Sequence, residues 1–150
     1  MNKYSTQLKN LTVTFIVYLA LTIGLSVLLN VAWQLTIDMS NMTPELFEAA
    51  VAQSNFIEIG SALIGVFSAV FCGAFIVKRS GYQSVKPALF FAVLLMFYGL
   101  LSALLHPEQV MIQKVSSLIM PFPLALLGAK LAMMLNKDAK LKAEPTASVS

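Results

Sequence analysis

The segment Leu11–Ile37, LTVTFIVYLALTIGLSVLLNVAWQLTI, decides the fold because it is long, apolar and free of charged residues. A helix needs about 20 residues to cross the roughly 30 Å hydrocarbon core of a bilayer. Three further apolar segments approach or exceed that length, at residues 56–77, 87–105 and 111–135. Because lipid offers the backbone no hydrogen-bond partner, these spans are expected to be helices. The sequence therefore predicts an all-α membrane protein with four transmembrane helices.

The composition supports a membrane protein. The chain has 150 residues, of which 58% are hydrophobic and 11% are charged, with a mean hydropathy of +0.80. A soluble domain of this length has too little interior for so many apolar side chains, so the lipid bilayer is the expected partner. We expect residues 1–135 to form one transmembrane domain and residues 136–150, which are polar and include a proline, to form a disordered cytoplasmic tail.

The basic residues predict the orientation of the spans. If the N-terminus, the loop between the second and third spans and the C-terminal tail share one side, that side holds nine of the ten basic residues: Lys3, Lys9, Lys78, Arg79, Lys86, Lys130, Lys137, Lys140 and Lys142. Only Lys114 lies on the other side. The positive-inside rule then places both termini in the cytoplasm. These residues are too few, and too confined to helix ends, to indicate a nucleic-acid partner.

The first outer loop, residues 38–55, contains signals for a short helix. Thr43 can cap a helix that begins with Pro44, and Glu45 would lie at the positive end of its dipole. We expect a short amphipathic helix that lies on the outer membrane surface or serves as a docking surface for a partner. Asn55 and Glu58 resemble a capping box at the start of the next span, although Glu58 is also a candidate carboxylate for a proton or cation.

Polar residues recur at every fourth position along the first span. Thr22, Ser26, Asn30 and Gln34 form this polar ladder, which extends back to Tyr18 and Thr14 and forward to Asp38. Residues four apart share a ridge of a helix, and amides facing lipid would be costly. We therefore expect the polar ladder to face the bundle or another protein as inter-helix glue. The alternative is a polar groove that opens outward beside His106 and the candidate outer-mouth charges Glu58 and Lys114.

Two further patterns concern helix packing. Ser61, Gly65, Ala69 and Gly73 form a small-residue stripe on the second span, which favours close approach of a neighbour, and the polar ladder is the neighbour we expect. Pro121 and Pro123 lie near the middle of the last predicted span. Each removes a backbone donor, so we expect a kink there, with a broken helix beside a cavity as the alternative.

The residue patterns disfavour an enzyme. The chain has no metal-binding spacing of histidines and carboxylates, no nucleophile–base pair and no Gly-rich phosphate loop, and its single cysteine, Cys72, is expected to be a packing residue. We predict no catalytic residue, metal or cofactor. The first hypothesis is an accessory or structural membrane protein that packs against itself or a larger complex. The alternative is an oligomeric transporter of small solutes or ions that uses the ladder groove and the proline kink.

Two segments carry a resemblance to known sequences. These are GAFIVKRSGY at Gly73–Tyr82 and PFPLALLGAKLA at Pro121–Ala132. They resemble small uncharacterised four-helix inner-membrane proteins of bacteria, which share a Gly-rich second span ending in a basic residue and a last span with proline and glycine. The resemblance implies a bacterial inner membrane as the location and implies no activity.

Overall fold

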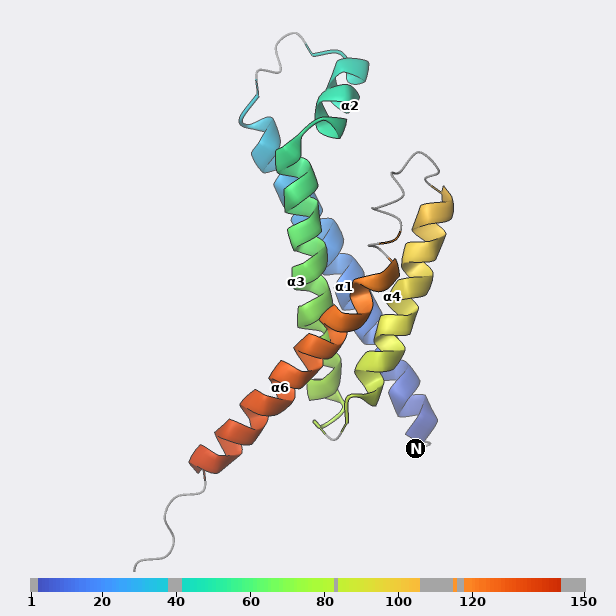
Figure 1. Cartoon of the computed structure of the whole chain (residues 1–150), viewed down its shortest axis with the longest axis vertical. Helices are drawn as coiled ribbons and strands as arrows, with labels where there is room; N and C mark the ends of the chain where they lie inside the picture. Colours follow the sequence, from blue (N-terminus) through green and yellow to red (C-terminus); the bar gives the residue numbers. More distant parts are fainter. Residues whose placement is uncertain (1–2, 38–41, 83, 106–114, 116–117, 144–150) are drawn as a thin grey trace, which may run out of the picture.

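The computed structural model describes residues 3–37, 42–82, 84–105, 115 and 118–143. The helices in this part of the chain are α1 (Lys3–Gln34), α2 (Pro44–Ala52), α3 (Asn55–Arg79), α4 (Lys86–Leu105) and α6 (Pro121–Ala143) (Figure 1). All regular structure within these ranges is helical, as the sequence predicted.

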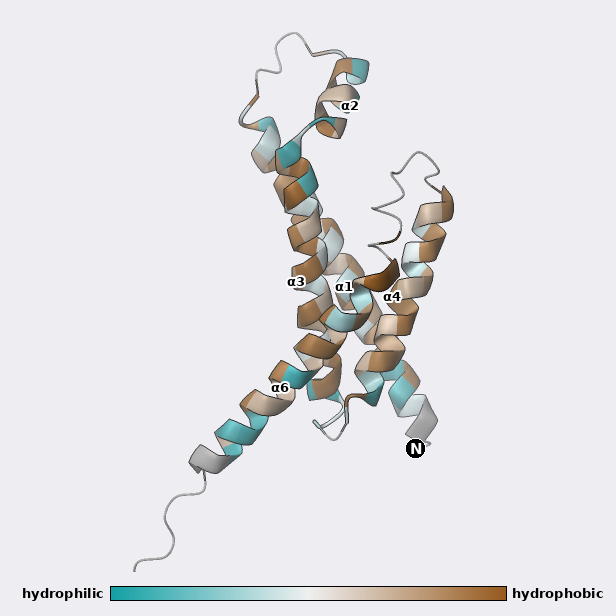
Figure 2. Cartoon of the chain, viewed as in Figure 1, coloured by the Kyte–Doolittle hydropathy of each residue, from teal (hydrophilic) through white to brown (hydrophobic). Residues whose placement is uncertain are grey.

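Three of the helices are long and apolar enough to cross a membrane. They cover Ser5–Gln34, Asn55–Arg79 and Lys86–Leu105, and they correspond to the first three predicted spans. The first of them ends at Gln34, three residues before the predicted end at Ile37. The fourth predicted span, residues 111–135, lies partly outside the described residues. Helix α6 is not among the three, because Lys130, Lys137 and Asp138 interrupt its apolar sequence. A bundle with three candidate membrane helices is therefore established, and a fourth span stays a prediction. Figure 2 shows how hydrophobic residues dominate α3 and α4, whereas polar residues dominate the far end of α6.

The core lies in the half of the bundle where α3 ends and α4 begins. It is built from apolar residues of α3, α4 and α6: Ala69, Cys72, Ile76, Val77, Ala88, Phe91, Ala92, Leu95, Ala125 and Ala129. Phe91 is the largest fully buried side chain. The ring of Tyr18 on α1 meets it edge to face, with 6.0 Å between ring centroids. Phe91 therefore ties α1 to α4.

Helix α6 crosses α3 with the two backbones in contact. A Cβ added at Gly73 would overlap the carbonyl of Ala125, and a Cβ added at Gly128 would overlap the carbonyl of Val70. Only glycine at these two positions allows so close an approach. Beyond the crossing, the C-terminal part of α6 leaves the bundle at an angle (Figure 1).

Helix α2 begins where the sequence predicted. Thr43 is its N-cap, with the Thr43 hydroxyl accepting a hydrogen bond from the backbone N–H of Leu46 at 3.4 Å, and Pro44 opens the first turn. The backbone N–H of Glu45 and the Thr43 hydroxyl also bond the Glu45 carboxylate and lower its pKa. Phe47 of α2 packs on the buried Trp33 of α1, with 5.7 Å between ring centroids.

Two further predicted boundaries are wrong. Helix α6 continues through Asn136 to Ala143, so residues 136–143 are not disordered. Alanine, leucine and lysine, which favour helices, outweigh the polar composition there. The rest of the predicted tail, residues 144–150, lies outside the described residues. Helix α3 is capped by Ser54 instead of Asn55, because the Ser54 hydroxyl accepts a hydrogen bond from the N–H of Ile57 at 3.3 Å. This shift places Glu58 one position beyond the capping-box site.

The two prolines lie at the start of a helix. Leu118 and Ile119 are helical, Met120 forms a turn, and α6 begins at Pro121. Proline fits the first turn of a helix, where the missing N–H would have had no partner within the helix. The helical path therefore breaks at this point, but Pro121 and Pro123 open α6 instead of lying in its middle.

Candidate functional site

The polar ladder does not keep to one face of α1. Each four-residue step advances about 40° around a helix with 3.6 residues per turn, so Asn30 lies roughly 160° around the helix from Thr14. Thr14 is fully buried against the bundle, whereas Thr22, Ser26 and Asn30 are half-buried. Thr14 therefore faces the bundle, whereas Gln34 is half-buried like the other three residues of the polar ladder, and the expectation that these four face the bundle or another protein stays a prediction.

The hydrogen bonds of the ladder run within α1. The hydroxyl of Thr22 donates to the carbonyl oxygen of Tyr18 at 2.8 Å, and the side-chain Nδ2 of Asn30 donates to the carbonyl oxygen of Ser26 at 2.8 Å. Among the described residues, the side-chain oxygen of Asn30 has no hydrogen-bond donor. Gln34 borders a shallow hollow beneath α2, beside Phe47. Asn30 thus retains hydrogen-bonding capacity that its own helix does not use.

The small-residue stripe makes its tightest contact with α6. Gly73 packs on Ala125 of α6, Ala69 is buried in the core, Gly65 is half-buried and Ser61 is exposed. The prediction that the ladder is the neighbour of this stripe is therefore wrong at its tightest contact. Helix α1 approaches α3 instead at Gly60, where the side chain of Leu29 occupies the space that a Cβ would need.

A cavity of about 470 Å³ lies among α1, α3, α4 and the start of α6. Apolar and small residues dominate its lining, which includes Gly65, Ala69, Leu95 and Pro121. The polar groups are the hydroxyls of Tyr18, Tyr98 and Ser102. The rings of Tyr18 and Tyr98 meet edge to face at 6.5 Å. No acidic or basic residue belongs to the described lining.

Of the two candidate outer-mouth charges, the structure describes only Glu58. Glu58 is exposed in the first turn of α3 and does not line the cavity. Its backbone carbonyl accepts a hydrogen bond from the hydroxyl of Ser61 at 2.9 Å. Lys114 and His106 lie outside the described residues. Among the described residues, no three His, Cys, Asp or Glu side chains lie close enough together to hold a metal ion.

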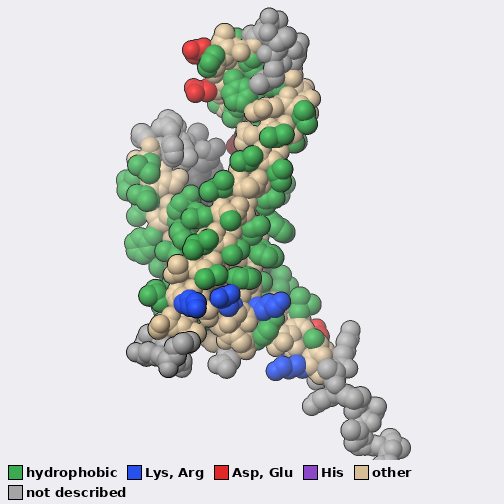
Figure 3. Space-filling model, turned by 180° about the vertical axis from the view of Figure 1, so that it is seen from behind, with side chains coloured by type: hydrophobic (Ala, Val, Ile, Leu, Met, Phe, Trp, Pro, Cys, Tyr) green, Lys and Arg blue, Asp and Glu red, His purple; other side chains and the backbone are tan. Residues whose placement is uncertain are grey.

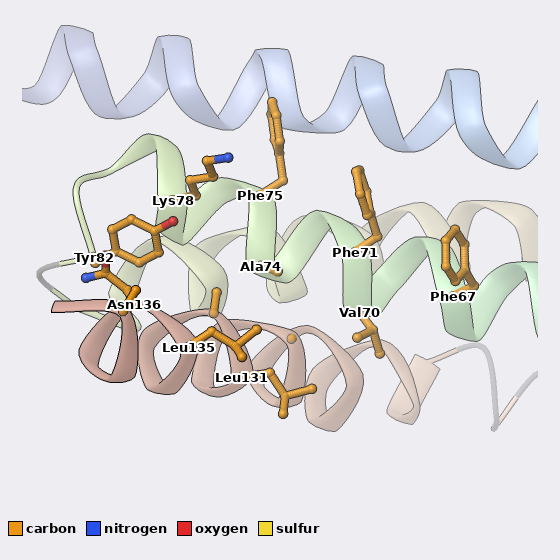
Figure 4. A pocket seen from close by; sticks show the side chains of 13 residues that line it. Phe67, Val70, Phe71, Ala74, Phe75, Lys78, Tyr82, Leu131, Leu135 and Asn136 are labelled. Atoms are coloured by element: carbon orange, nitrogen blue, oxygen red, sulfur yellow. The ribbon is translucent and has the colours of Figure 1, made fainter. Parts of the chain in front are cut away.

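The sequence analysis did not identify a groove between α3 and α6. This α3/α6 groove has a volume of about 570 Å³. Phe67, Phe71 and Phe75 stack along one wall, with centroid distances of 6.1 and 6.4 Å between successive rings (Figure 4). Lys78, Tyr82 and Asn136 lie together at the end of the groove beyond Phe75 (Figure 4). The four-residue spacing of the phenylalanines was a signal that could have revealed this wall.

Helix α1 carries a face that no described element covers. The uncovered face of α1 comprises Ile16, Ala20, Ile23, Gly24 and Val27, all of which are exposed. A Cβ added at Gly24 would meet no atom within 4 Å. In the most apolar stretch of α1, only 6% of the residues are buried within the chain, compared with 28% in the corresponding stretches of α3 and α4. Helix α1 is therefore the least packed of the three candidate membrane helices.

Charges are segregated along the bundle. Lys78 and Arg79 end α3 and Lys86 begins α4, and Figure 3 shows the basic side chains gathered near one end of the bundle. The acidic side chains of α2 lie at the opposite end (Figure 3). Arg79 also links α3 to α1, because its Nε donates to Oδ1 of Asn10 at 3.0 Å.

The fold defines the class as a helical-bundle membrane protein with three candidate membrane-spanning helices. No family model, no curated protein and no solved structure matches this chain.

Proposed function

We propose that the chain is a small accessory membrane protein that packs laterally, through the uncovered face of α1, against a transmembrane helix of a larger complex or of a second copy. The observation that carries this proposal is Asn30. Its half-buried amide lies at the border of that face, and its side-chain oxygen has no described donor. Hydrocarbon offers no such donor, whereas a neighbouring helix can supply one.

The position of Asn30 relative to the apolar face supports the proposal. Asn30 follows Val27 by three residues and Ile23 by seven, so the three side chains are neighbours on α1. An apolar face bordered by one amide is a common arrangement at helix–helix contacts in membranes, where small residues permit close approach and polar residues add hydrogen bonds. Ala20 and Gly24, four residues apart, supply the small pair.

We further propose the orientation and location. The chain lies in a bacterial inner membrane with both termini in the cytoplasm, a fourth crossing through residues 111–135 and α2 at the outer surface. The gathering of basic side chains at one end of the bundle supports this orientation through the positive-inside rule. The resemblance of residues 73–82 and 121–132 to small bacterial membrane proteins supports the location.

Cysteine labelling tests the orientation. In a Cys72→Ala background, a cysteine at Glu48 on α2 is expected to react with an impermeant maleimide applied to intact spheroplasts. A cysteine at Lys140 on α6 is expected to react only after permeabilisation. Both side chains are exposed, so burial does not limit either reaction. The reverse pattern of labelling would refute the proposed orientation.

Gly24→Leu tests lateral packing. A Cβ at position 24 would meet no atom beyond the local backbone of α1 within 4 Å, so the fold is expected to persist. The leucine side chain would obstruct a partner helix, and overpacking of this kind weakens association by roughly tenfold or more. The measurement is native mass spectrometry of the complex after mild detergent extraction. Ala32→Leu, at an exposed position of α1 outside the uncovered face, is the control and should retain the complex.

Asn30→Leu is expected to weaken the same complex by about threefold, in keeping with the modest average strength of inter-helix hydrogen bonds in membranes. Full retention of the complex in Gly24→Leu and Asn30→Leu would rule out α1 as the contact.

The second candidate function is an oligomeric transporter of small solutes or ions. The cavity among α1, α3 and α4, with the hydroxyls of Tyr18, Tyr98 and Ser102, is the observation that favours it. Purified homo-oligomers in liposomes would then carry flux, and Gly65→Leu, which projects into this cavity, would reduce it. Absence of flux from a stoichiometric complex with another protein would favour the accessory function.

A further inference from the structure

We propose that the α3/α6 groove binds one anionic phospholipid from the leaflet at the basic end of the bundle. An acyl chain lies along the stacked phenylalanines, and the headgroup phosphate meets Lys78, Tyr82 and Asn136. This proposal does not depend on the accessory function, because that function uses the uncovered face of α1 and not this groove.

The groove has the shape and lining that an acyl chain requires. Its volume of about 570 Å³ falls within the range of about 300–1,000 Å³ that is usual for ligand sites. Phe67 and Phe71 are 57% and 44% exposed, so the aromatic wall is open to an occupant. Leu131 and Leu135 of α6 form the opposite wall (Figure 4). A flexible hydrocarbon chain can follow this apolar trough along both helices.

The polar end supplies hydrogen-bond donors. The Lys78 ammonium, the Tyr82 hydroxyl and the Asn136 amide all line that end, from the end of α3, the turn after it and α6 (Figure 4). Within the described residues, none of the three side chains has a hydrogen-bond or ion-pair partner. A phosphodiester presents acceptor oxygens and a negative charge, which match these donors.

The backbone holds Tyr82 in an uncommon conformation beside this end. Tyr82 has φ +58° and follows Gly81 with φ +78°. The left-handed region is unfavourable for a bulky residue and persists only when its surroundings enforce it. Here the N–H of Tyr82 donates to the carbonyl of Val77 at 3.0 Å, which folds the turn back onto the end of α3. The turn thereby places Tyr82 at the same end of the groove as Lys78 and Asn136 (Figure 4).

The charge pattern selects a phospholipid over a partner helix. An apolar helix in the groove would leave Lys78, Tyr82 and Asn136 without acceptors, whereas an acyl chain with one anionic head satisfies both parts of the groove. An acyl chain enters the groove from the bilayer core, which is also apolar. The apolar walls therefore confer little selectivity between lipids. The headgroup therefore determines the preference, and Lys78 is its main source.

Native mass spectrometry of the full chain in mild detergent tests the proposal. The protein is titrated separately with phosphatidylglycerol and with phosphatidylcholine of identical acyl chains. We expect one phosphatidylglycerol to bind in preference to phosphatidylcholine. Lys78→Gln is expected to weaken phosphatidylglycerol binding about fivefold, the factor for losing one basic residue at an anionic membrane surface. Lys130→Gln, an equal change of charge at an exposed position of α6 outside the groove, should leave it unchanged.

Two further variants separate the parts of the groove. Tyr82→Phe keeps the ring and removes the hydroxyl, so it should reduce the preference for phosphatidylglycerol. Phe71→Ala should weaken binding of both lipids together. Equal binding of the two lipids by the wild type would overturn the proposal, as would equal losses in Lys78→Gln and Lys130→Gln. A dimer that excludes lipid and dissociates in Phe71→Ala would assign the groove to a second copy and overturn it as well.

Discussion

Phe91→Ala is expected to destabilise the bundle by about 3 kcal/mol, the lower end of the usual cost of about 3–5 kcal/mol for removing a buried phenylalanine ring. Phe91 is fully buried and meets Tyr18 edge to face, so its loss leaves a cavity where α1 meets α4. We expect a cost at the lower end of this range because, on unfolding, the ring moves into detergent or lipid, which is also an apolar medium. The cavity and lost packing then account for most of the cost.

The neighbouring residue provides the control for this prediction. Phe90 is on the same helix and is 65% exposed, so Phe90→Ala should change the free energy of unfolding by less than about 1 kcal/mol. The measurement is reversible unfolding in mixed micelles, followed by circular dichroism. Equal destabilisation by Phe91→Ala and Phe90→Ala would contradict the described packing of α4.

Gly73→Ala is expected to destabilise the chain by about 1–3 kcal/mol, the usual cost of overpacking, and to loosen α6 from α3. The added methyl would overlap the backbone carbonyl of Ala125, and backbone cannot rotate away as a side chain can. Gly128→Ala should have a similar effect, because its methyl would overlap the carbonyl of Val70. Unfolding in the same micelles measures both.

The matched control for Gly73 comes from its own stripe. A Cβ at Gly65 would meet no atom within 4 Å, so Gly65→Ala should leave stability unchanged or slightly increase it, since alanine favours a helix more than glycine does. If Gly65→Ala and Gly73→Ala had the same effect, the α3–α6 crossing would be wrong.

The long helices could be predicted because their signal is local. Long apolar runs predict α1, α3 and α4, and Thr43 followed by Pro44 predicts the start of α2. The extension of α6 to Ala143 was missed because polar composition outweighed helix propensity in the interpretation. The cap at Ser54 was missed because serine and asparagine are nearly equal as N-caps, and spacing alone does not choose between them.

The partners of each helix face could not be predicted from one sequence. The stripe through Gly73 indicates a close approach but does not say that Ala125 makes it. The polar ladder follows a four-residue repeat, whereas a helix turns every 3.6 residues, so a strict repeat drifts from the buried face at Thr14 to the edge at Asn30. The polar ladder is therefore a ridge that winds around α1 and not a single face of the helix.

The α3/α6 groove could not be predicted from the sequence for the same reason. Lys78 and Tyr82 are close in sequence, but Asn136 joins them only because α6 crosses α3. The phenylalanine spacing at Phe67 and Phe71 predicts a shared helix face and leaves open whether that face is core, lipid contact or groove wall.

Photocrosslinking in the native membrane tests the central claim most directly. A photoreactive amino acid replaces Val27, which is 55% exposed on the uncovered face of α1, and, as a control, Phe97, which is 66% exposed on α4. We expect position 27 to give one discrete protein adduct, either with another membrane protein or with a second copy, and position 97 to give lipid adducts. Lipid adducts alone from position 27 would contradict the proposal that α1 packs against a partner helix.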